Sequence, residues 1–386
     1  MRNVVFLFMI KRIYQDLGSF LHPQEVLILY GPRRVGKTTL LEDFLKKSNL
    51  KYRLETGDNI LIRDILSSNN LTRIREYLEG YELLAIDEAQ SIPNIGENLK
   101  LIIDKMPEVK VIATGSSSFD LANQVGEPLT GRKTTLTLYP ISQLELLENN
   151  NNSFDLKQKL EEFLIFGSYP KVVTADSRDE KIRLIEELVG SYILKDILAL
   201  EKVKGSKIIL DLLKLLAFQV GNEVSLGELS RQLSIDGKTV GRYLDLLEKS
   251  FIITRLGGFS RNLRSEITDK SKYYFLDNGI RNGVISQFNG LDSRNDIGQL
   301  WENFIFTERL KKRSYQHLYG QSYFWRTYEQ QEIDLIEERD GKLFAYEYKW
   351  STKHKDIKAP KKWKESYPDC VSFQVIDKEN YLDFIG

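Results

Sequence analysis

The sequence predicts a multidomain α/β protein, and three observations support this fold class. The chain has 386 residues, enough for two or three domains with buried cores. In its first part, apolar runs of strand length alternate with amphipathic helical segments, the pattern of an open α/β sheet. A helix–turn–helix pattern and a further group of short strands follow, so the later part requires separate domains.

Composition narrows the class of protein. Charged residues make up 28% of the chain, hydrophobic residues 41%, and the formal net charge is zero, so any basic surface is local. Cys370 is the single cysteine, which excludes an internal disulfide and suits a reducing compartment; we expect a cytoplasmic protein. No apolar run approaches the length that spans a bilayer, and we expect no membrane partner. The short apolar run 4–10 is interpreted as a strand or extended start.

The first motif is a glycine-bounded loop between an apolar run at 26–30 and an amphipathic segment at 40–45. It matches G-x-x-x-x-G-K-[ST], a pattern whose glycines let successive backbone N–H groups point at phosphates. The lysine reaches the β- and γ-phosphates, and the following hydroxyl ligates magnesium. We therefore expect ATP to contact Gly31, Pro32, Arg33, Arg34, Val35, Gly36, Lys37, Thr38 and Thr39.

The second motif is an apolar run at 83–87 that ends in two acids. We expect Asp87, with Thr38, to hold magnesium, and Glu88 to orient and deprotonate the attacking water. The competing interpretation is an ordinary acidic strand end. The preceding phosphate loop favours the catalytic interpretation, which makes Lys37 and Glu88 candidate catalytic residues.

Two further polar positions are candidates for the same site. Ser116 follows the apolar strand 109–114 and can face the γ-phosphate, or it can be a helix N-cap. Arg132 can stabilise transition-state charge, within its own subunit or across an interface of a homo-oligomer. A surface arginine at a turn is the alternative interpretation.

The loop GPRRVGKTT, the strands LLAIDEAQ and VIATGSSS, and the segment LTGRKTTLTLYPISQLEL together resemble one branch of the AAA+ superfamily of P-loop ATPases. Members of this branch carry a C-terminal domain that resembles restriction endonucleases. The resemblance implies a parallel sheet in the strand order of the additional-strand ATPases, a helical lid, and ATP with Mg²⁺. It does not imply a substrate.

Residues 205–282 have the order of a winged helix–turn–helix. A helix at 208–220 is followed by a capping box at 225–228, a second helix at 237–249, and strands at 252–256 and 273–276. We expect DNA contacts from the second helix and from the basic loop at 257–272, although packing against another domain is the alternative. The candidate DNA-contacting residues are Lys238, Thr239, Arg242 and Tyr243 on the helix, and Arg261, Arg264, Lys270 and Lys272 in the loop.

The last region places Asp334, Glu347 and Lys349 on two neighbouring predicted strands, in the D-x(n)-E-x-K arrangement of restriction-endonuclease-like folds. Glu347 and Lys349 share one strand face because the side-chain period is two. Asp334 and Glu347 can then share a metal, while Glu302 lies on an amphipathic helix where the family's helical acid usually does. A basic segment with interleaved tryptophans follows at 350–364, as a nucleic-acid face or a solvated surface.

These patterns divide the chain into an ATPase core (1–148), a helical lid (149–204), a winged helix–turn–helix (205–282) and an endonuclease-like domain (283–386). The leading hypothesis is a Mg²⁺-dependent ATPase that couples nucleotide state to the C-terminal domains and acts on DNA. The alternatives are an ATP-gated DNA nuclease and a non-catalytic, ATP-dependent switch that binds a protein.

Overall fold

The computed structural model describes residues 10–116, 126, 128–149, 152–193, 206–260, 270–351 and 357–386. Its described residues fall into two compact units, which lie within Met1–Ile141 and Ser142–Gly386. The division lies before helix α6 (Gln143–Glu148), whereas the sequence placed it after residue 148. The finer division of the second unit into three domains stays a prediction.

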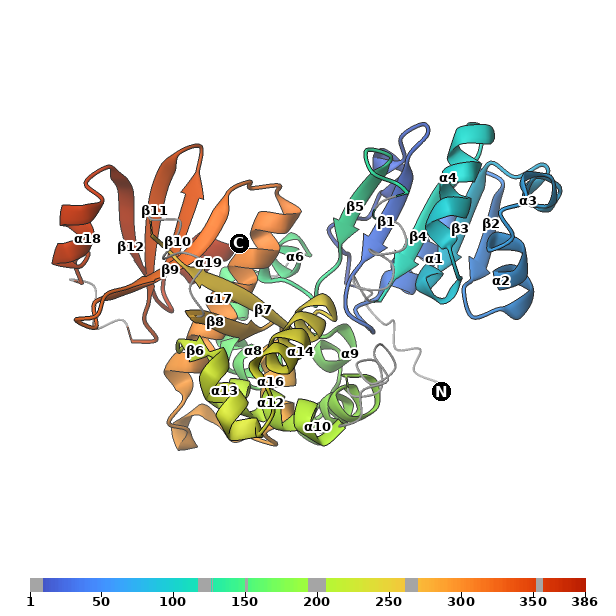
Figure 1. The fold of residues 1–386 in the computed structure, drawn as a ribbon. Helices are drawn as coiled ribbons and strands as arrows, with labels where there is room; N and C mark the ends of the chain where they lie inside the picture. The colour runs from blue at the N-terminus through green and yellow to red at the C-terminus, as the bar shows by residue number, and fades with distance from the viewer. Residues whose placement is uncertain are drawn as a thin grey trace. The chain divides into compact units, whose positions relative to one another are not determined.

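The first unit contains a parallel sheet in the order β2-β3-β4-β1-β5 among its described residues (Figure 1). Strand β4 lies between β1 and β3, which is the order expected for the additional-strand ATPases. The carboxyl ends of β1 and β3 therefore lie at one edge of the sheet, where α/β folds bind ligands. The strands are β1 (Val26–Tyr30), β2 (Tyr52–Thr56), β3 (Leu83–Asp87), β4 (Lys110–Gly115) and β5 (Lys133–Thr137).

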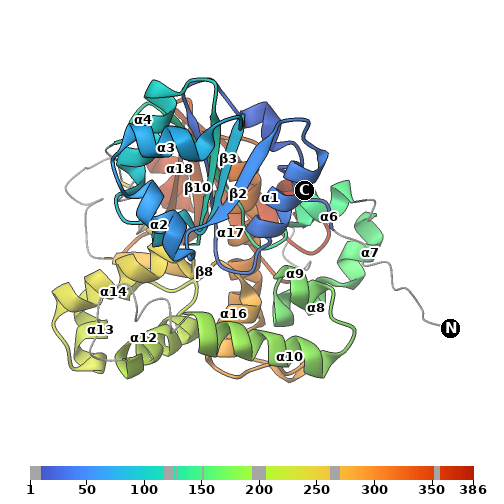
Figure 2. The ribbon, with the colours of Figure 1, turned by 90° about the vertical axis from the view of Figure 1, so that its right-hand side faces the viewer.

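Helices cover both faces of this sheet. Figure 2 shows α1 on one side of the strands and α3 with α4 on the other, as right-handed crossovers require. Strands β1 and β4 are almost entirely buried, which explains why they are continuous apolar runs rather than alternating ones. The helices are α1 (Lys37–Lys47), α2 (Ile60–Leu66), α3 (Leu71–Leu78) and α4 (Ile95–Lys105), with 3₁₀ turns at Leu17–Phe20 and Ala89–Ser91.

The second unit contains a mixed sheet in the order β12-β11-β10-β9-β7-β8-β6 among its described residues. Strand β7 of the predicted winged helix pairs in parallel with β9 of the predicted endonuclease-like region, so one sheet combines strands from both ranges. The strands are β6 (Val224–Ser225), β7 (Ile253–Gly258), β8 (Lys270–Phe275), β9 (Gln321–Arg326), β10 (Glu332–Arg339), β11 (Lys342–Tyr348) and β12 (Cys370–Ile376).

Helix α16 (Asn278–Val284) is the central helix of the second unit, and all seven of its residues are buried. It packs against α8, α10, α12 and α17 (Figure 2). The remaining helices are α7 (Ser153–Gln158), α8 (Leu160–Phe166), α9 (Pro170–Val173), α10 (Arg178–Glu187), α12 (Ser206–Phe218), α13 (Leu226–Leu233), α14 (Gly237–Lys249), α17 (Ile297–Tyr315), α18 (Lys361–Ser366) and α19 (Tyr381–Ile385), with a π-helical turn at Leu188–Ile193 and a 3₁₀ turn at Leu291–Ser293.

Most predicted strands and helices are confirmed, but three strands were not predicted: β2, β6 and β12. Strand β2 alternates exposed and half-buried residues at the edge of its sheet, so it lacks the apolar run that marks the central strands. The predicted strand at 4–10 lies almost entirely outside the described residues. No helix in the described part of the chain is long and apolar enough to cross a membrane.

Candidate functional site: a phosphate-binding loop and an acid cluster

The loop between β1 and α1 has a backbone that its glycines make possible. Gly31 has φ +152°, and a Cβ there would lie 2.1 Å from the Leu138 carbonyl oxygen. Gly36 has φ +98° and precedes the first residue of α1. Lys37 is buried, and its Nζ donates to the carbonyl oxygens of Gly31 and Pro32, each at 2.9 Å. The ammonium is therefore held at the mouth of the loop, where a phosphate chain would lie.

The other loop residues have distinct environments. Val35 is fully buried and anchors the loop in the core, whereas Arg33, Thr38 and Thr39 are exposed. Arg34 has φ +62°, a left-handed conformation that is uncommon outside glycine. Three of the nine predicted ATP contacts are thus exposed residues.

Arg12 lies outside the motif but stabilises the phosphate-binding loop through hydrogen bonds. This buried guanidinium donates to the Val35 carbonyl oxygen and to the Tyr139 carbonyl oxygen, the latter at 2.5 Å. It therefore joins the phosphate-binding loop to the segment after β5. Its large separation from both partners along the chain leaves no local sequence signal for this role.

The structure brings Thr38 and Asp87 together. Thr38 Oγ1 donates to Asp87 Oδ2 at 2.8 Å, while the Thr114 hydroxyl donates to the other oxygen, Oδ1. A hydroxyl and a carboxylate at this spacing are hard oxygen donors of the kind that Mg²⁺ prefers. These residues therefore fit a magnesium ion beside the loop, with Thr114 orienting the carboxylate.

Glu88 occupies a strained backbone position at the end of β3. Its φ is +52°, a conformation that non-glycine residues rarely adopt and that clusters at functional sites. Gly57, after β2, supports it: Gly57 N donates to the Asp87 carbonyl oxygen at 2.8 Å, and a Cβ on Gly57 would lie 2.2 Å from the Glu88 carbonyl oxygen. Only glycine fits at this position without moving Glu88.

The Glu88 side chain is oriented by the neighbouring strand. Ser116 Oγ donates to Glu88 Oε2 at 3.0 Å, and the Gln90 amide donates to Ser116 Oγ at 3.1 Å and to Glu88 Oε2. Ser116 therefore belongs to this network. The alternative role as a helix N-cap depends on residues 117–120, which lie outside the described residues. Gln90 had not been predicted.

Arg132 is far from this network within its own unit. The Arg132 carbonyl accepts from Val26 N at the start of β1, so the residue lies at the amino edge of the parallel sheet, opposite the loop. Its guanidinium pairs with Asp104 of α4. A catalytic role within the same subunit is therefore wrong, because five residues of β1 separate this edge from Gly31. The role across a subunit interface stays a prediction.

The predicted endonuclease residues form a second cluster. The antiparallel register of β10 and β11 pairs Leu335 with Tyr346, so the next position places Asp334 opposite Glu347. Tyr348 N donates to Asp334 Oδ2 at 2.7 Å, and Lys349 Nζ donates to Glu347 Oε1 at 2.6 Å. The other oxygen, Glu347 Oε2, is buried and has no hydrogen-bond partner among the described residues.

Lys272 of β8, predicted to contact DNA, lies instead in this cluster. Its fully buried ammonium pairs with Glu332 Oε1 at 2.5 Å, Glu302 Oε1 at 3.1 Å and Asp334 Oδ1 at 3.8 Å. Tyr274 also donates to Glu302 Oε1, at 2.7 Å. Glu302 is thus held by an ammonium and a phenol, and the prediction that Lys272 faces DNA is wrong.

Burial and like charges act together in the cluster. Burial raises the pKa of Asp334 well above its usual range, and the carboxylates of Glu302 and Glu347 raise it further. Burial likewise raises the pKa of Glu347, against the lowering effect of Lys349. In the part of the chain that the structure describes, no group of three or more histidine, cysteine or acidic residues forms a metal site. The cluster brings the predicted residues together without assembling a three-ligand metal site.

The predicted DNA-contacting helix is α14. Asp236 caps it by accepting from Thr239 N at 2.9 Å and Thr239 Oγ1 at 2.6 Å, so this hydroxyl is engaged within the helix end. Lys238 and Arg242 are exposed, as a contact with DNA requires. Tyr243 is 5% exposed and packs in the core, so its predicted contact with DNA is wrong. Arg261 and Arg264 lie outside the described residues.

Comparisons with known families match three separate stretches. Residues 23–147 match the model of the AAA domain family. Residues 157–291 and 297–383 match two domains of unknown function, DUF8612 and DUF4143. The chain is similar to an uncharacterised protein of Methanocaldococcus jannaschii, at 25% identity over 95% of this chain and 85% of the relative. It is also similar to uncharacterised proteins of Mycobacterium tuberculosis (26%; 86% of this chain, 72% of the relative) and Haemophilus influenzae (26%; 77% of each).

Two solved structures are similar to the chain. A Walker-type ATPase of Pyrococcus abyssi aligns at 15% identity, covering 67% of this chain and 91% of that one, with a TM-score of 0.45. AMPPCP-bound DnaA from Aquifex aeolicus aligns at 16% identity, covering 61% and 85%, with a TM-score of 0.25. The strand order, the phosphate-binding loop and the family match over residues 23–147 together show that the first unit has the α/β fold of a P-loop ATPase domain.

Proposed function

We propose that the chain is a Mg²⁺-dependent ATPase. The observation that carries the proposal is the hydrogen bond from Thr38 to Asp87, next to the Glu88–Ser116–Gln90 network. Lys37 binds the phosphates, Thr38 and Asp87 hold the metal, and Glu88 is the general base for the attacking water. Magnesium supplies neutralisation of the phosphate charge when bound.

The magnesium assignment is tested by binding an ATP analogue with and without the metal. Thr38→Ala and Asp87→Asn should each lower the affinity for the ATP analogue in Mg²⁺. In a chelator, their affinity should equal that of the unmodified protein. Lys47→Ala, on the same helix but exposed at its end, is the matched control. Equal affinity of all variants in Mg²⁺ would show that these residues do not hold the metal.

We further propose that nucleotide state is coupled to the second unit and that this unit acts on DNA. The exposed Lys238 and Arg242 on α14 support DNA contact, and the wing residues Arg261 and Arg264 remain part of the proposal. Hydrolysis measured with and without duplex DNA tests the coupling. Lys238→Ala with Arg242→Ala should remove the stimulation, whereas Lys342→Ala, also exposed in this unit, should not.

The second candidate function is an ATP-gated nuclease. The observation that favours it is the apposition of Asp334 and Glu347 beside Lys349, with Glu347 Oε2 lacking a partner among the described residues. Supercoiled plasmid incubated with Mg²⁺ or Mn²⁺, with and without ATP, is the test. Nicking that Lys349→Ala removes would establish the nuclease, and intact plasmid under all conditions would reject it.

The third candidate is a non-catalytic switch that binds ATP and a protein partner. Slow hydrolysis that DNA does not change would favour it over the proposed ATPase. A mixing experiment tests whether Arg132 acts across an interface of a homo-oligomer. If the arginine acts in a neighbouring subunit, mixing Arg132→Ala with Lys37→Ala subunits would restore turnover. Recovery of activity on mixing would thus support a homo-oligomer.

A further inference from the structure

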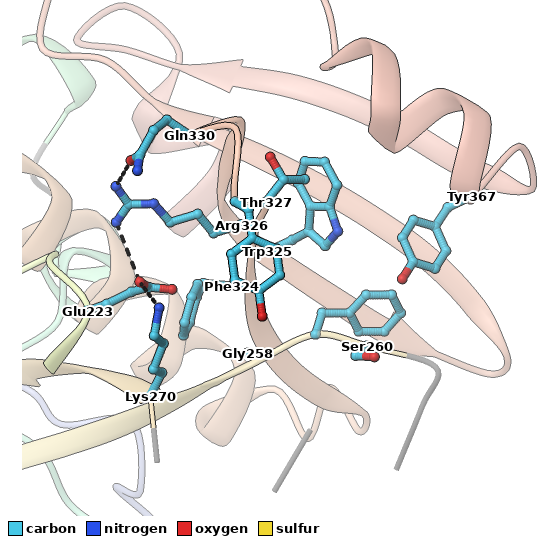
Figure 3. Close-up of a pocket in the computed structure, with 12 residues that line it drawn as sticks. Glu223, Gly258, Ser260, Lys270, Phe324, Trp325, Arg326, Thr327, Gln330 and Tyr367 are labelled. Atoms are coloured by element: carbon cyan, nitrogen blue, oxygen red, sulfur yellow. Dashed lines mark hydrogen bonds and ion pairs between the residues drawn. The ribbon is translucent and has the colours of Figure 1, made fainter. Parts of the chain in front are cut away.

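A pocket of about 550 Å³ in the second unit combines aromatic and cationic side chains. Its volume lies within the range of small-ligand sites. Figure 3 shows Arg326 and Lys270 on one side and Tyr367 on the other. The lining residues that carry the argument are Lys270, Phe324, Trp325, Arg326, Tyr328 and Tyr367.

The aromatic wall of the pocket is rigid because it is the edge of a packed cluster. Phe259 lies 5.1 Å from Tyr367 and 5.8 Å from Trp363, measured between ring centroids, and Trp325 lies 5.3 Å from Trp363. Trp363 itself is buried. Rings held in this way are preorganised, so a planar ligand loses little by ordering them.

Tyr328 differs from these rings because it is completely exposed, although it lines the same pocket. An isolated exposed aromatic ring contributes nothing to the core. Tyr328 lies beside a pocket with cationic groups, and it is as accessible as the aromatic side chains on which unpaired bases stack. Single-stranded nucleic-acid sites combine such rings with cations that follow the backbone.

The cations of the pocket outnumber its anions. Glu223 Oε2 is shared by Lys270 Nζ at 3.3 Å and Arg326 Nη1 at 3.8 Å, so the residues that line the pocket carry one positive charge in excess (Figure 3). Arg326 Nε also lies 3.9 Å from Glu332 Oε2, which is outside the lining. Lys270 and Glu223 are solvent-accessible, and their pairing is weak enough for a phosphate to compete. Arg326 also donates to Gln330, which fixes the guanidinium at the rim.

Helix α18 extends the positive charge beyond the pocket. Its backbone at Lys362 donates to Gln331 Oε1 at 3.3 Å, and the Lys362 side chain pairs with Glu329, so α18 adjoins the turn that carries Tyr328. Lys361 and Lys364 of this helix are exposed, as is Lys358, which precedes it. These lysines belong to the basic segment 350–364, which has no role in the proposed ATPase reaction.

We propose that this pocket binds an unpaired base of single-stranded nucleic acid, with the strand's phosphates along Lys270, Arg326 and the lysines of α18. The inference goes beyond the ATPase and rests on the proposed action on DNA for the choice of DNA over RNA. It differs from the duplex contact proposed for α14, because base stacking in the pocket requires a base that is not paired.

The test is a fluorescence-anisotropy titration of the full chain with a labelled single-stranded DNA. Tyr328→Ala should weaken binding about 5- to 150-fold, the range for loss of one stacked base, and Tyr328→Phe should restore it. Arg326→Gln should lower the dependence of affinity on salt by about one phosphate contact. Tyr319→Ala removes another tyrosine of this unit, 83% exposed and outside the pocket, and should leave binding unchanged.

Four further probes distinguish the sources of the signal. If unlabelled single-stranded RNA competes as well as DNA, the pocket is supported but the preference for DNA is not. If a free mononucleotide competes as well as the strand, the proposed phosphate contacts of α18 are overturned. Duplex DNA that binds as tightly as the strand, equally in all Tyr328 variants, overturns the inference. Hydrolysis of ATP without DNA, measured on the same samples, shows separately whether the proposed ATPase holds.

Discussion

Glu88 is the proposed general base of the nucleotide site, and its position depends on Gly57, which follows strand β2. A methyl group on Gly57 would meet the Glu88 carbonyl oxygen at 2.2 Å, so Gly57→Ala must displace the proposed general base. A displacement of about 1 Å can cost roughly 100-fold in rate. We therefore expect Gly57→Ala to lower kcat by about 100-fold with little change in ATP affinity.

The matched control is Gly126→Ala in the same unit, because an added Cβ there meets none of the described residues within 4 Å. Its kcat should equal that of the unmodified protein. Full turnover in Gly57→Ala, measured by phosphate release at saturating ATP, would show that the position of Glu88 does not limit the reaction.

The buried charge of Asp334 destabilises the folded protein, so removing this charge should raise its stability. Its pKa is raised in the folded protein by burial first and by Glu302 and Glu347 next. The stability that this group contributes is therefore present below its unfolded pKa, near 3.8, and is lost as pH rises through the folded value. Asp334→Asn removes the charge and keeps an acceptor for Tyr348 N.

We expect Asp334→Asn to melt a few degrees higher than the unmodified protein at neutral pH. The difference should shrink as the pH falls toward 4, because the native carboxyl then takes up its proton. Thermal unfolding followed across this pH range measures both quantities. A variant that melts lower at neutral pH, or a difference that does not change with pH, would contradict the electrostatic account of the cluster.

At the scale of elements, buried polar groups connect segments that are distant in the chain. Asp277 caps α16 through Ile280 N at 3.1 Å, and its other oxygen accepts from Ser168 N at 2.7 Å, after α8. Gly167 stands beside this carboxylate with φ +71°, and a Cβ there would lie 2.0 Å from Asp277 Oδ1. The turn between α8 and α9 is thus fitted to the start of α16.

Gly167→Ala should therefore destabilise the second unit by about 2–5 kcal/mol. The left-handed backbone costs about 1–2 kcal/mol for a residue with a Cβ, and overpacking adds about 1–3 kcal/mol. Gly341→Ala isolates the backbone contribution, since Gly341 has φ +74° and an added Cβ there would contact no atom of the described part of the chain within 4 Å. Chemical denaturation should separate the two variants, and equal losses would show that Asp277 does not fix this turn.

Many of the strands and helices were predictable, although the strands β2, β6 and β12 and the helices α4, α16, α18 and α19 were not predicted. Apolar runs marked β1, β3 and β4, and the helical period marked α14 and α17, because burial on defined faces leaves a local pattern. Edge strand β2 and the two-residue β6 leave no such pattern. The pairing of β7 with β9, which unites two predicted domains in one sheet, depends on contacts between distant segments and had no sequence signal.

At the scale of the whole molecule, the residues of a motif were predictable, but the residues that hold them in place through long-range contacts were not. Lys37, Thr38, Asp87 and Glu88 could be chosen from the sequence because the phosphate loop and the acidic strand end are local motifs. Arg12, Gly57 and Gln90 could not, since their contacts form only when the strands β1 to β5 align in the sheet. Lys272 looked like a residue of a basic loop, and only the tertiary fold places it among carboxylates.

The measurement that tests the central claim most directly is the rate of phosphate release from Mg·ATP by the purified chain and two variants. The account predicts turnover by the unmodified protein, no tight ATP binding by Lys37→Ala, and ATP binding without turnover by Glu88→Gln. Hydrolysis retained in both variants would contradict the assignment of the nucleotide site.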